Sequence, residues 1–269
     1  MFFGPRDPQN ALGMYSSTYF IALFICMAAT ATALIFSRKM RKDTVKKVVI
    51  GVGIFLWLTE FGKMLFVGLT YGIKEVEFFP LYFCSMFMYA SVLTCFKNKT
   101  LQTTANAFMF FGGIVGAVTF FCFPTAVIPY YPLFHYMTLR TLVYHSLMIY
   151  VGILIVMTGY YQPKLKHFKE YAIFLWITFS LAYIFNRLQG TNLMYISEPL
   201  NIGFVKAVYA VIPRAYPFIV ALIQLVVPFF LSFGVYRFII YLQERRKTAN
   251  KSEEFLLEGE TCLVCGEGE

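Results

Sequence analysis

Residues 48–70 read VVIGVGIFLWLTEFGKMLFVGLT, a run of bilayer-spanning length in which only Glu60 and Lys63 are charged. A helix needs about 20 predominantly apolar residues to cross the hydrocarbon core of a membrane. Similar runs recur along most of the 269-residue chain, in which 59% of positions are hydrophobic and 14% are charged. Soluble domains carry roughly twice this share of charge. The sequence therefore predicts a helical integral membrane protein and excludes a water-soluble globule.

Apolar windows and helix breakers predict an all-α fold, a bundle of seven transmembrane helices within residues 1–243. The predicted spans are 15–36, 48–70, 78–96, 101–122, 137–158, 171–188 and 215–241. From residue 244 the chain is first basic and then acidic, which is typical of a flexible extension. Residues 244–269 are therefore predicted to form a charged cytoplasmic tail.

Lysine and arginine are distributed unequally between the two predicted sides of the membrane. The loops after the first, third and fifth spans, together with the C-terminal end, hold 16 of them, against six on the other side. Because basic loops remain in the cytoplasm, this pattern predicts an external N-terminus and a cytoplasmic C-terminus. The net charge of +9 thus resides in membrane-flanking loops, and no nucleic-acid partner is expected.

Four predicted spans carry polar side chains at membrane depth, where a charge costs about 2.5–3.5 kcal/mol. Each has an ordinary explanation when taken alone, such as an ion pair, a packed thiol or a hydrogen-bonded imidazole. Counted from the predicted outer ends at about 1.5 Å per residue, however, all of them lie in the outer half of the membrane. These residues are Glu60, Lys63, Cys84, His145 and Asn186. Their common depth predicts one polar chamber that opens toward the outer leaflet.

Several of these segments resemble the YwaF family of integral membrane proteins, which is mainly bacterial. The resemblance rests on Pro80–Cys84, the helix around His145, Gly190–Ile196 with Asn186 and Pro199, and the acidic Glu60. Related animal transmembrane proteins are implicated in phospholipid acyl transfer. The resemblance implies the fold given above, a multi-pass location in a bacterial cytoplasmic membrane, and a membrane lipid as substrate. Tyr82 stands where the family pattern has a histidine.

The leading functional hypothesis is cysteine-dependent acyl transfer on a lipid of the outer leaflet. Cys84 would attack an acyl ester, His145 would move the proton, and Glu60 would orient or charge-balance the imidazole. A second set of residues would bind the head group or the developing oxyanion. The expected members of this substrate-binding set are Lys63, Asn186, Thr191 and Asn192.

Two other classes of function fit the same sequence. A proton-coupled transporter of small solutes would use Glu60, Lys63 and His145. A seven-helix sensor or assembly factor would signal through its charged tail. The tail also contains Cys262 and Cys265 at CxxC spacing, but structural zinc needs four ligands, so no metal and no cofactor is expected.

Overall fold

Six helices in the computed structural model are long and apolar enough to cross a membrane, within the described residues 2–72, 78–199 and 203–264. No strand occurs in this part of the chain. The long elements are α1 (Ser17–Ser37), α2 (Lys42–Thr70), α6 (Tyr136–Met157), α7 (Phe168–Gln189) and α9 (Tyr216–Val264), together with a central helix. The short ones are α3 (Met86–Leu93) and α8 (Gly203–Val211). The predicted all-α membrane fold is confirmed.

The predicted span 78–96 is not a helix of spanning length. Only the eight residues of α3 are α-helical there, and the segment before α3 forms turns. Pro80 lacks a backbone N–H and disfavours helical geometry in the residue before it, so no helix grows through this position. The first helix-like bonds run from Met86 N to the carbonyls of Tyr82 and Phe83. A seventh span, and with it the orientation deduced from seven, is therefore not confirmed.

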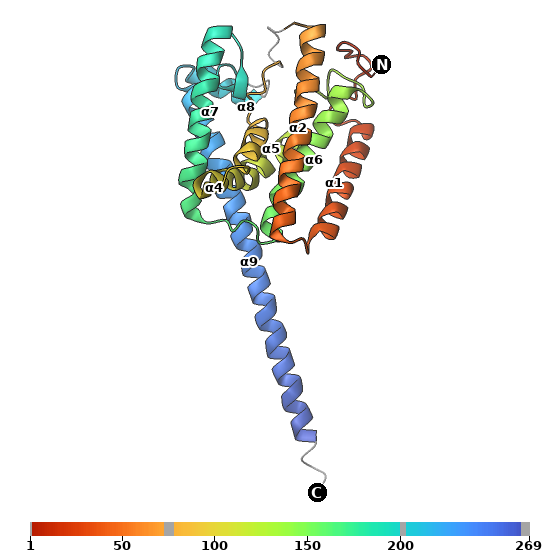
Figure 1. Ribbon diagram of the computed structural model, residues 1–269, viewed down its shortest axis with the longest axis vertical. Helices are drawn as coiled ribbons and strands as arrows, with labels where there is room; N and C mark the ends of the chain where they lie inside the picture. Colours follow the sequence, from red (N-terminus) through yellow and green to blue (C-terminus); the bar gives the residue numbers. More distant parts are fainter. Residues whose placement is uncertain (1, 73–77, 200–202, 265–269) are drawn as a thin grey trace.

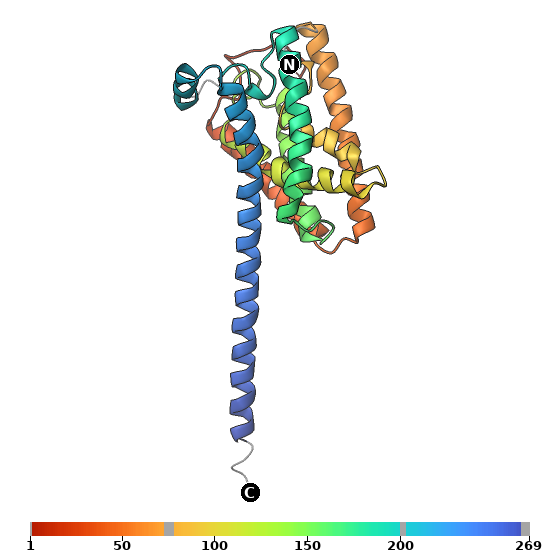
Figure 2. The ribbon, with the colours of Figure 1, turned by 90° about the vertical axis from the view of Figure 1, so that its left-hand side faces the viewer.

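The central helix passes obliquely through the bundle and is its most buried element (Figures 1 and 2). It is continuous from α4 (Lys99–Ala107) through a π-helical segment (Phe108–Gly113) into α5 (Ile114–Cys122). It packs against α3, α6, α7 and α9. Single π-helical turns of this kind often occur at functional sites. The residues of the candidate site pack against this helix.

The long helix α9 continues beyond the other helices in both views (Figures 1 and 2). The predicted tail from residue 244 is thus helical as far as Val264. Residues 265–269, including Cys265 of the predicted CxxC pair, lie outside the described residues. The end of the bundle from which α9 projects also holds the start of α2 and the connection between α6 and α7. Most of the basic residues counted above therefore belong to this end.

At the other end of the bundle, the N-terminal segment is attached to His135, the residue that caps α6. His135 is buried, its Nδ1 accepts a bond from Met137 N (3.1 Å), and its Nε2 is 3.0 Å from the carbonyl of Gly4. The two contacts require a neutral imidazole with the proton on Nε2. Burial lowers the pKa of His135 from its ordinary value of 6.5.

Acidification is expected to loosen this attachment. Because the folded-state pKa of His135 is lowered, its contribution to stability is present above about pH 6.5 and decreases as the pH falls below that value. Hydrogen exchange of residues 2–12 should therefore accelerate between about pH 7 and pH 5. The variant His135→Asn keeps an N-cap acceptor without a titrating group, so its exchange, corrected for intrinsic rates, should be independent of pH. An unchanged pH dependence in this variant would contradict the assignment.

Candidate functional site

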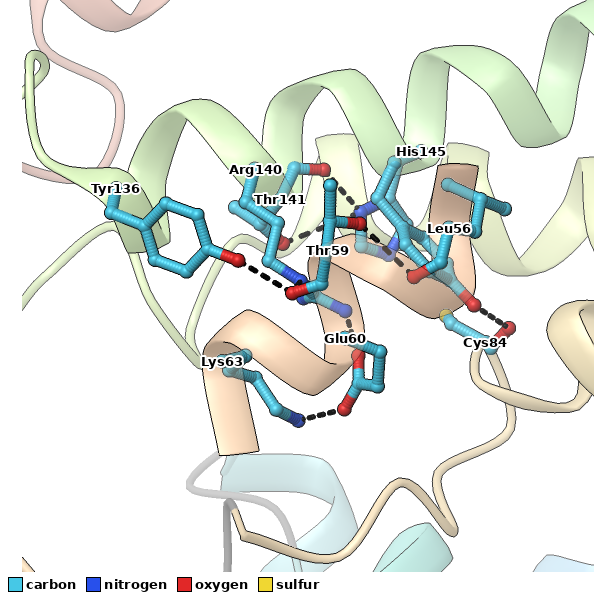
Figure 3. A network of polar contacts seen from close by, with 10 residues as sticks. Leu56, Thr59, Glu60, Lys63, Cys84, Tyr136, Arg140, Thr141 and His145 are labelled. Carbon is cyan, nitrogen blue, oxygen red and sulfur yellow. Dashed lines mark hydrogen bonds and ion pairs between the residues drawn. The ribbon is translucent and has the colours of Figure 1, made fainter. Parts of the chain in front are cut away.

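A charged cluster joins α2 to α6 inside the bundle (Figure 3). The carboxylate of Glu60 is 1% exposed; its Oε1 is 2.5 Å from the ammonium of Lys63, and its Oε2 pairs with the guanidinium of Arg140. Arg140 Nε also donates to the carbonyl of Thr59 at 3.3 Å. Glu60 and Lys63 are one turn apart on α2, as their spacing predicted. Arg140 is a member of the site that the sequence analysis missed.

The signal for Arg140 was present in the sequence, because an arginine inside the predicted span 137–158 needs a partner at membrane depth. The structure also shows how α6 comes close enough to provide it. The hydroxyl of Tyr136 donates to Thr59 O at 2.5 Å, beside Gly62. A Cβ at Gly62 would lie 2.5 Å from that hydroxyl. The absence of a side chain at position 62 therefore lets α6 approach α2.

Cys84 lies in the turn before α3, partly buried against the central helix. Its thiol donates to the carbonyl of Gly116 at 3.7 Å, and a Cβ at Gly116 would lie 3.5 Å from the sulfur. The hydroxyl of Tyr144 donates to the carbonyl of Cys84 at 3.1 Å. The same tyrosine ring lies 5.1 Å from the guanidinium of Arg140. Tyr144 thus connects the backbone of the cysteine to the charged cluster.

His145 is buried on the neighbouring position of α6. Its Nδ1 is 2.7 Å from the carbonyl of Thr141, which can only accept, so Nδ1 carries the proton and Nε2 keeps its lone pair. The ring stacks on Phe120 with a centroid separation of 3.8 Å. Among the described residues, no hydrogen bond or ion pair joins His145 to Cys84 or to Glu60.

Cys84 and His145 nevertheless contact the same face of α5. Gly116, which accepts the thiol, and Phe120, which stacks on the imidazole, are four residues apart on that helix. Residues at this spacing are neighbours on one face, separated by about one turn, or 5.4 Å. The structure therefore brings the predicted nucleophile and base to adjacent positions along α5 without placing them in direct contact.

Asn186 organises the loop that follows α7. Its Oδ1 accepts bonds from the backbone N–H of Leu193 (2.7 Å) and the hydroxyl of Thr191 (2.8 Å), and its Nδ2 donates to the carbonyl of Leu193 (3.0 Å). Asn192 has a similar role: its Oδ1 accepts from the backbone of Ser197 and Glu198. These predicted substrate-binding side chains are thus engaged within their own loop.

This loop covers the segment that leads to Cys84. Met194 and Tyr195 adopt positive φ angles of 55° and 54°, which are uncommon outside glycine and mark a constrained backbone. Gln224 of α9 donates to the carbonyl of Met194 at 2.9 Å. The ring of Tyr195 lies 5.7 Å from that of Tyr82, two residues before the cysteine. The loop is therefore hydrogen-bonded to α9 on one side and packs on Tyr82 on the other.

Comparison with known proteins places the chain in a membrane-protein family. The model of the TMEM164 family matches residues 14–235, which include every residue of the site described above. No curated protein and no solved structure matches the chain. The match identifies a membrane-protein family, but not the YwaF family that the segments resemble. Because this match covers far more than half of the sequence, the chain belongs to the TMEM164 family.

Proposed function

We propose that this protein transfers acyl groups between membrane lipids through a thioester on Cys84. The proposal rests on the position of the Cys84 thiol, which contacts α5 one helical turn from the contact made by His145. Because Nδ1 of His145 donates to the carbonyl of Thr141, its Nε2 keeps a lone pair that can accept a proton. A nucleophile and a base at neighbouring positions are the minimum that acyl transfer requires.

The proposed reaction needs only the side chains of Cys84 and His145, a donor lipid and an acceptor lipid. His145 takes the thiol proton as the sulfur of Cys84 attacks the carbonyl carbon of a lipid acyl ester, forming a C–S bond. The C–O bond then breaks, and the leaving alkoxide receives the proton from the imidazole. In the second half, the hydroxyl of an acceptor lipid gives its proton to His145 and attacks the thioester. A new C–O bond forms, the C–S bond breaks, and His145 returns the proton to the sulfur of Cys84.

The charged cluster serves as the positioning part of this mechanism. Glu60 fixes Arg140, Arg140 lies over the ring of Tyr144, and Tyr144 holds the backbone of Cys84. We assign Lys63 to the same cluster, close to where an anionic head group would enter from the predicted outer leaflet. The loop that packs on Tyr82 is kept in shape by the hydrogen bonds of Asn186, Thr191 and Asn192.

The decisive experiment is to trap and then discharge the acyl-enzyme. Purified protein in nanodiscs with a labelled phospholipid is expected to acquire one hydroxylamine-labile acyl group on Cys84, detected by intact mass and peptide mapping. Adding an unlabelled lysophospholipid should remove it and yield labelled product lipid. The variant Cys84→Ala should lose both steps, whereas Cys26→Ala, which removes another partly buried thiol, should keep them.

Discharge to the acceptor distinguishes a catalytic thioester from a static lipid modification of Cys84. His145→Gln should slow acylation by about 10²–10⁴-fold, the usual contribution of a general base. An acyl group that stays on Cys84 after addition of the acceptor would refute the proposal. Labelled product formed equally well by Cys84→Ala would refute it too.

Proton-coupled transport is the second candidate, because Glu60, Lys63 and Arg140 form a charged cluster buried between helices. A transporter needs a polar route to both faces of the membrane. Beyond the cluster, the described core is aromatic, with fully buried side chains at Phe108, Phe111, Tyr171 and Phe229. This core favours acyl transfer. Proton-dependent solute uptake in proteoliposomes that survives Cys84→Ala and fails in Glu60→Gln would favour transport instead.

A further inference from the structure

A basic cleft of about 470 Å³ is lined by residues from the start of α2 and from the connection between α6 and α7. These segments lie at the end of the bundle from which α9 projects (Figure 1). Its lining includes Lys42, Lys99, Lys164, Lys166, His167 and Asn106. Lys42 and Glu60 are 18 residues apart on the same helix, so the cleft is about 27 Å from the charged cluster. The cleft is therefore distinct from the candidate acyl-transfer site and belongs to the opposite end of the bundle.

Three helices begin at this cleft. Lys42 is the first residue of α2, Lys99 is the first residue of α4, and Lys164 immediately precedes the 3-10 turn Leu165–His167, which continues into α7. The N-terminus of a helix presents free N–H groups and the positive end of its dipole, which together attract anions. Neither α2 nor the helical run that starts at Leu165 and continues into α7 has a side-chain cap that satisfies these groups. The backbone and the lysines therefore both favour a negatively charged ligand.

Nearby acidic residues offset only part of this charge. Asp43 lies in the first turn of α2 and Glu170 in the first turn of α7. Four lysines line the cleft, so these two carboxylates neutralise only about half of their charge. Lysines are the usual point-charge partners of phosphate groups, and several around one cleft suit a ligand with more than one negative charge.

Asn106 supplies an independent sign of a ligand. Its side chain is 7% exposed, lines the cleft, and has an Oδ1 atom without a hydrogen-bond partner in the described part of the chain. A buried amide left unsatisfied costs about 1–3 kcal/mol, so such groups are usually satisfied by a ligand or by ordered water. Rotation of the amide about its terminal bond exchanges Oδ1 for the Nδ2 donor, which an anionic oxygen would accept.

We propose that this cleft binds the phosphate group of an anionic ligand. The charge, the converging helix N-termini and the buried amide all favour a phosphate, and the volume exceeds the need of a single small ion. A phospholipid head group of the adjacent leaflet and a soluble phosphorylated compound share this chemistry. The experiment therefore has one arm for each source.

The full chain is placed in phosphatidylcholine nanodiscs with or without a phosphatidylinositol phosphate, and the lipids retained by the protein are counted by native mass spectrometry. In the second arm, inorganic pyrophosphate is titrated onto the protein in detergent while its thermal unfolding is followed. The double variant Lys99→Gln/Lys164→Gln is compared with Lys39→Gln/Lys97→Gln, which removes equal charge from the same end outside the cleft. The cleft variant should weaken binding by about 25-fold, since one lysine near the surface contributes about fivefold. The control variant should change it by about fivefold or less.

Asn106→Leu tests the cleft without altering its charge, and it too should weaken binding. Retention of the lipid alone assigns the site to a head group, whereas stabilisation by pyrophosphate alone assigns it to a soluble compound. Equal losses in the two lysine variants would show general attraction by a basic surface and overturn the proposal. Absence of binding in both arms would also overturn it. None of these readouts depends on Cys84, so failure here leaves the proposed acyl transfer untouched.

Discussion

Replacing Arg140 with methionine is expected to lower the free energy of unfolding by about 3–5 kcal/mol. The substitution removes the guanidinium partner from Glu60, a carboxylate that is 1% exposed between α2 and α6. Lys63 stays within reach of the other carboxylate oxygen. The bond to Thr59 O and the contact with the Tyr144 ring are lost as well. The measurement is a denaturant titration in mixed micelles, followed by the fluorescence of Trp57 and Trp176.

Two further variants separate the lost charge partner from lost packing. The triple variant Glu60→Gln/Lys63→Met/Arg140→Met removes every charge of the cluster, so it should recover much of the stability that Arg140→Met loses. Arg187→Met, at the exposed end of α7, should shift stability by about 0.5 kcal/mol or less. A triple variant no more stable than Arg140→Met would show that packing, rather than the loss of a charge partner from the carboxylate, causes the loss of stability.

The spans were predictable because they depend on local composition, and the range 78–96 shows where that dependence ends. Its residues are as apolar as those of a true span. Hydropathy cannot distinguish a helix in lipid from an irregular segment buried in protein, and membrane proteins tolerate irregular backbone where protein covers it. Phe79 packs on Phe185 of α7, and Tyr82 on Tyr195 of the loop. Pro80 was the local sign that this segment is not a continuous helix.

Contacts between side chains of the site could be predicted from the sequence only where both partners lie on one helix. The contact between Glu60 and Lys63 follows from a spacing of three residues. The contact between Glu60 and Arg140 depends on how α2 and α6 are rotated about their axes, which depth along the membrane does not determine. The same limit applies to Cys84 and His145, whose similar depth was predicted while their separation along α5 was not.

Introducing valine at Gly152 is expected to destabilise the protein by about 3 kcal/mol. A Cβ at this position would lie 2.6 Å from Cγ1 of Ile114 and 2.8 Å from the backbone carbonyl of Met109, which belongs to the π-helical segment. A side chain can rotate away from a clash, but a carbonyl inside a buried helix cannot. The central helix and α6 would therefore have to separate. The same denaturant titration measures the loss.

Gly51→Val is the matched control, because no atom lies within 4 Å of a Cβ at Gly51. Its stability should stay within about 0.5 kcal/mol of the parent protein. Since α6 also carries Tyr144 and His145, separating it from the central helix should move these residues away from Cys84. Gly152→Val is thus expected to lower the rate of Cys84 acylation even under conditions where it remains folded, and Gly51→Val is not. A folded Gly152→Val protein with full acylation would mean that the fit of α6 on the π-helical segment does not position the site.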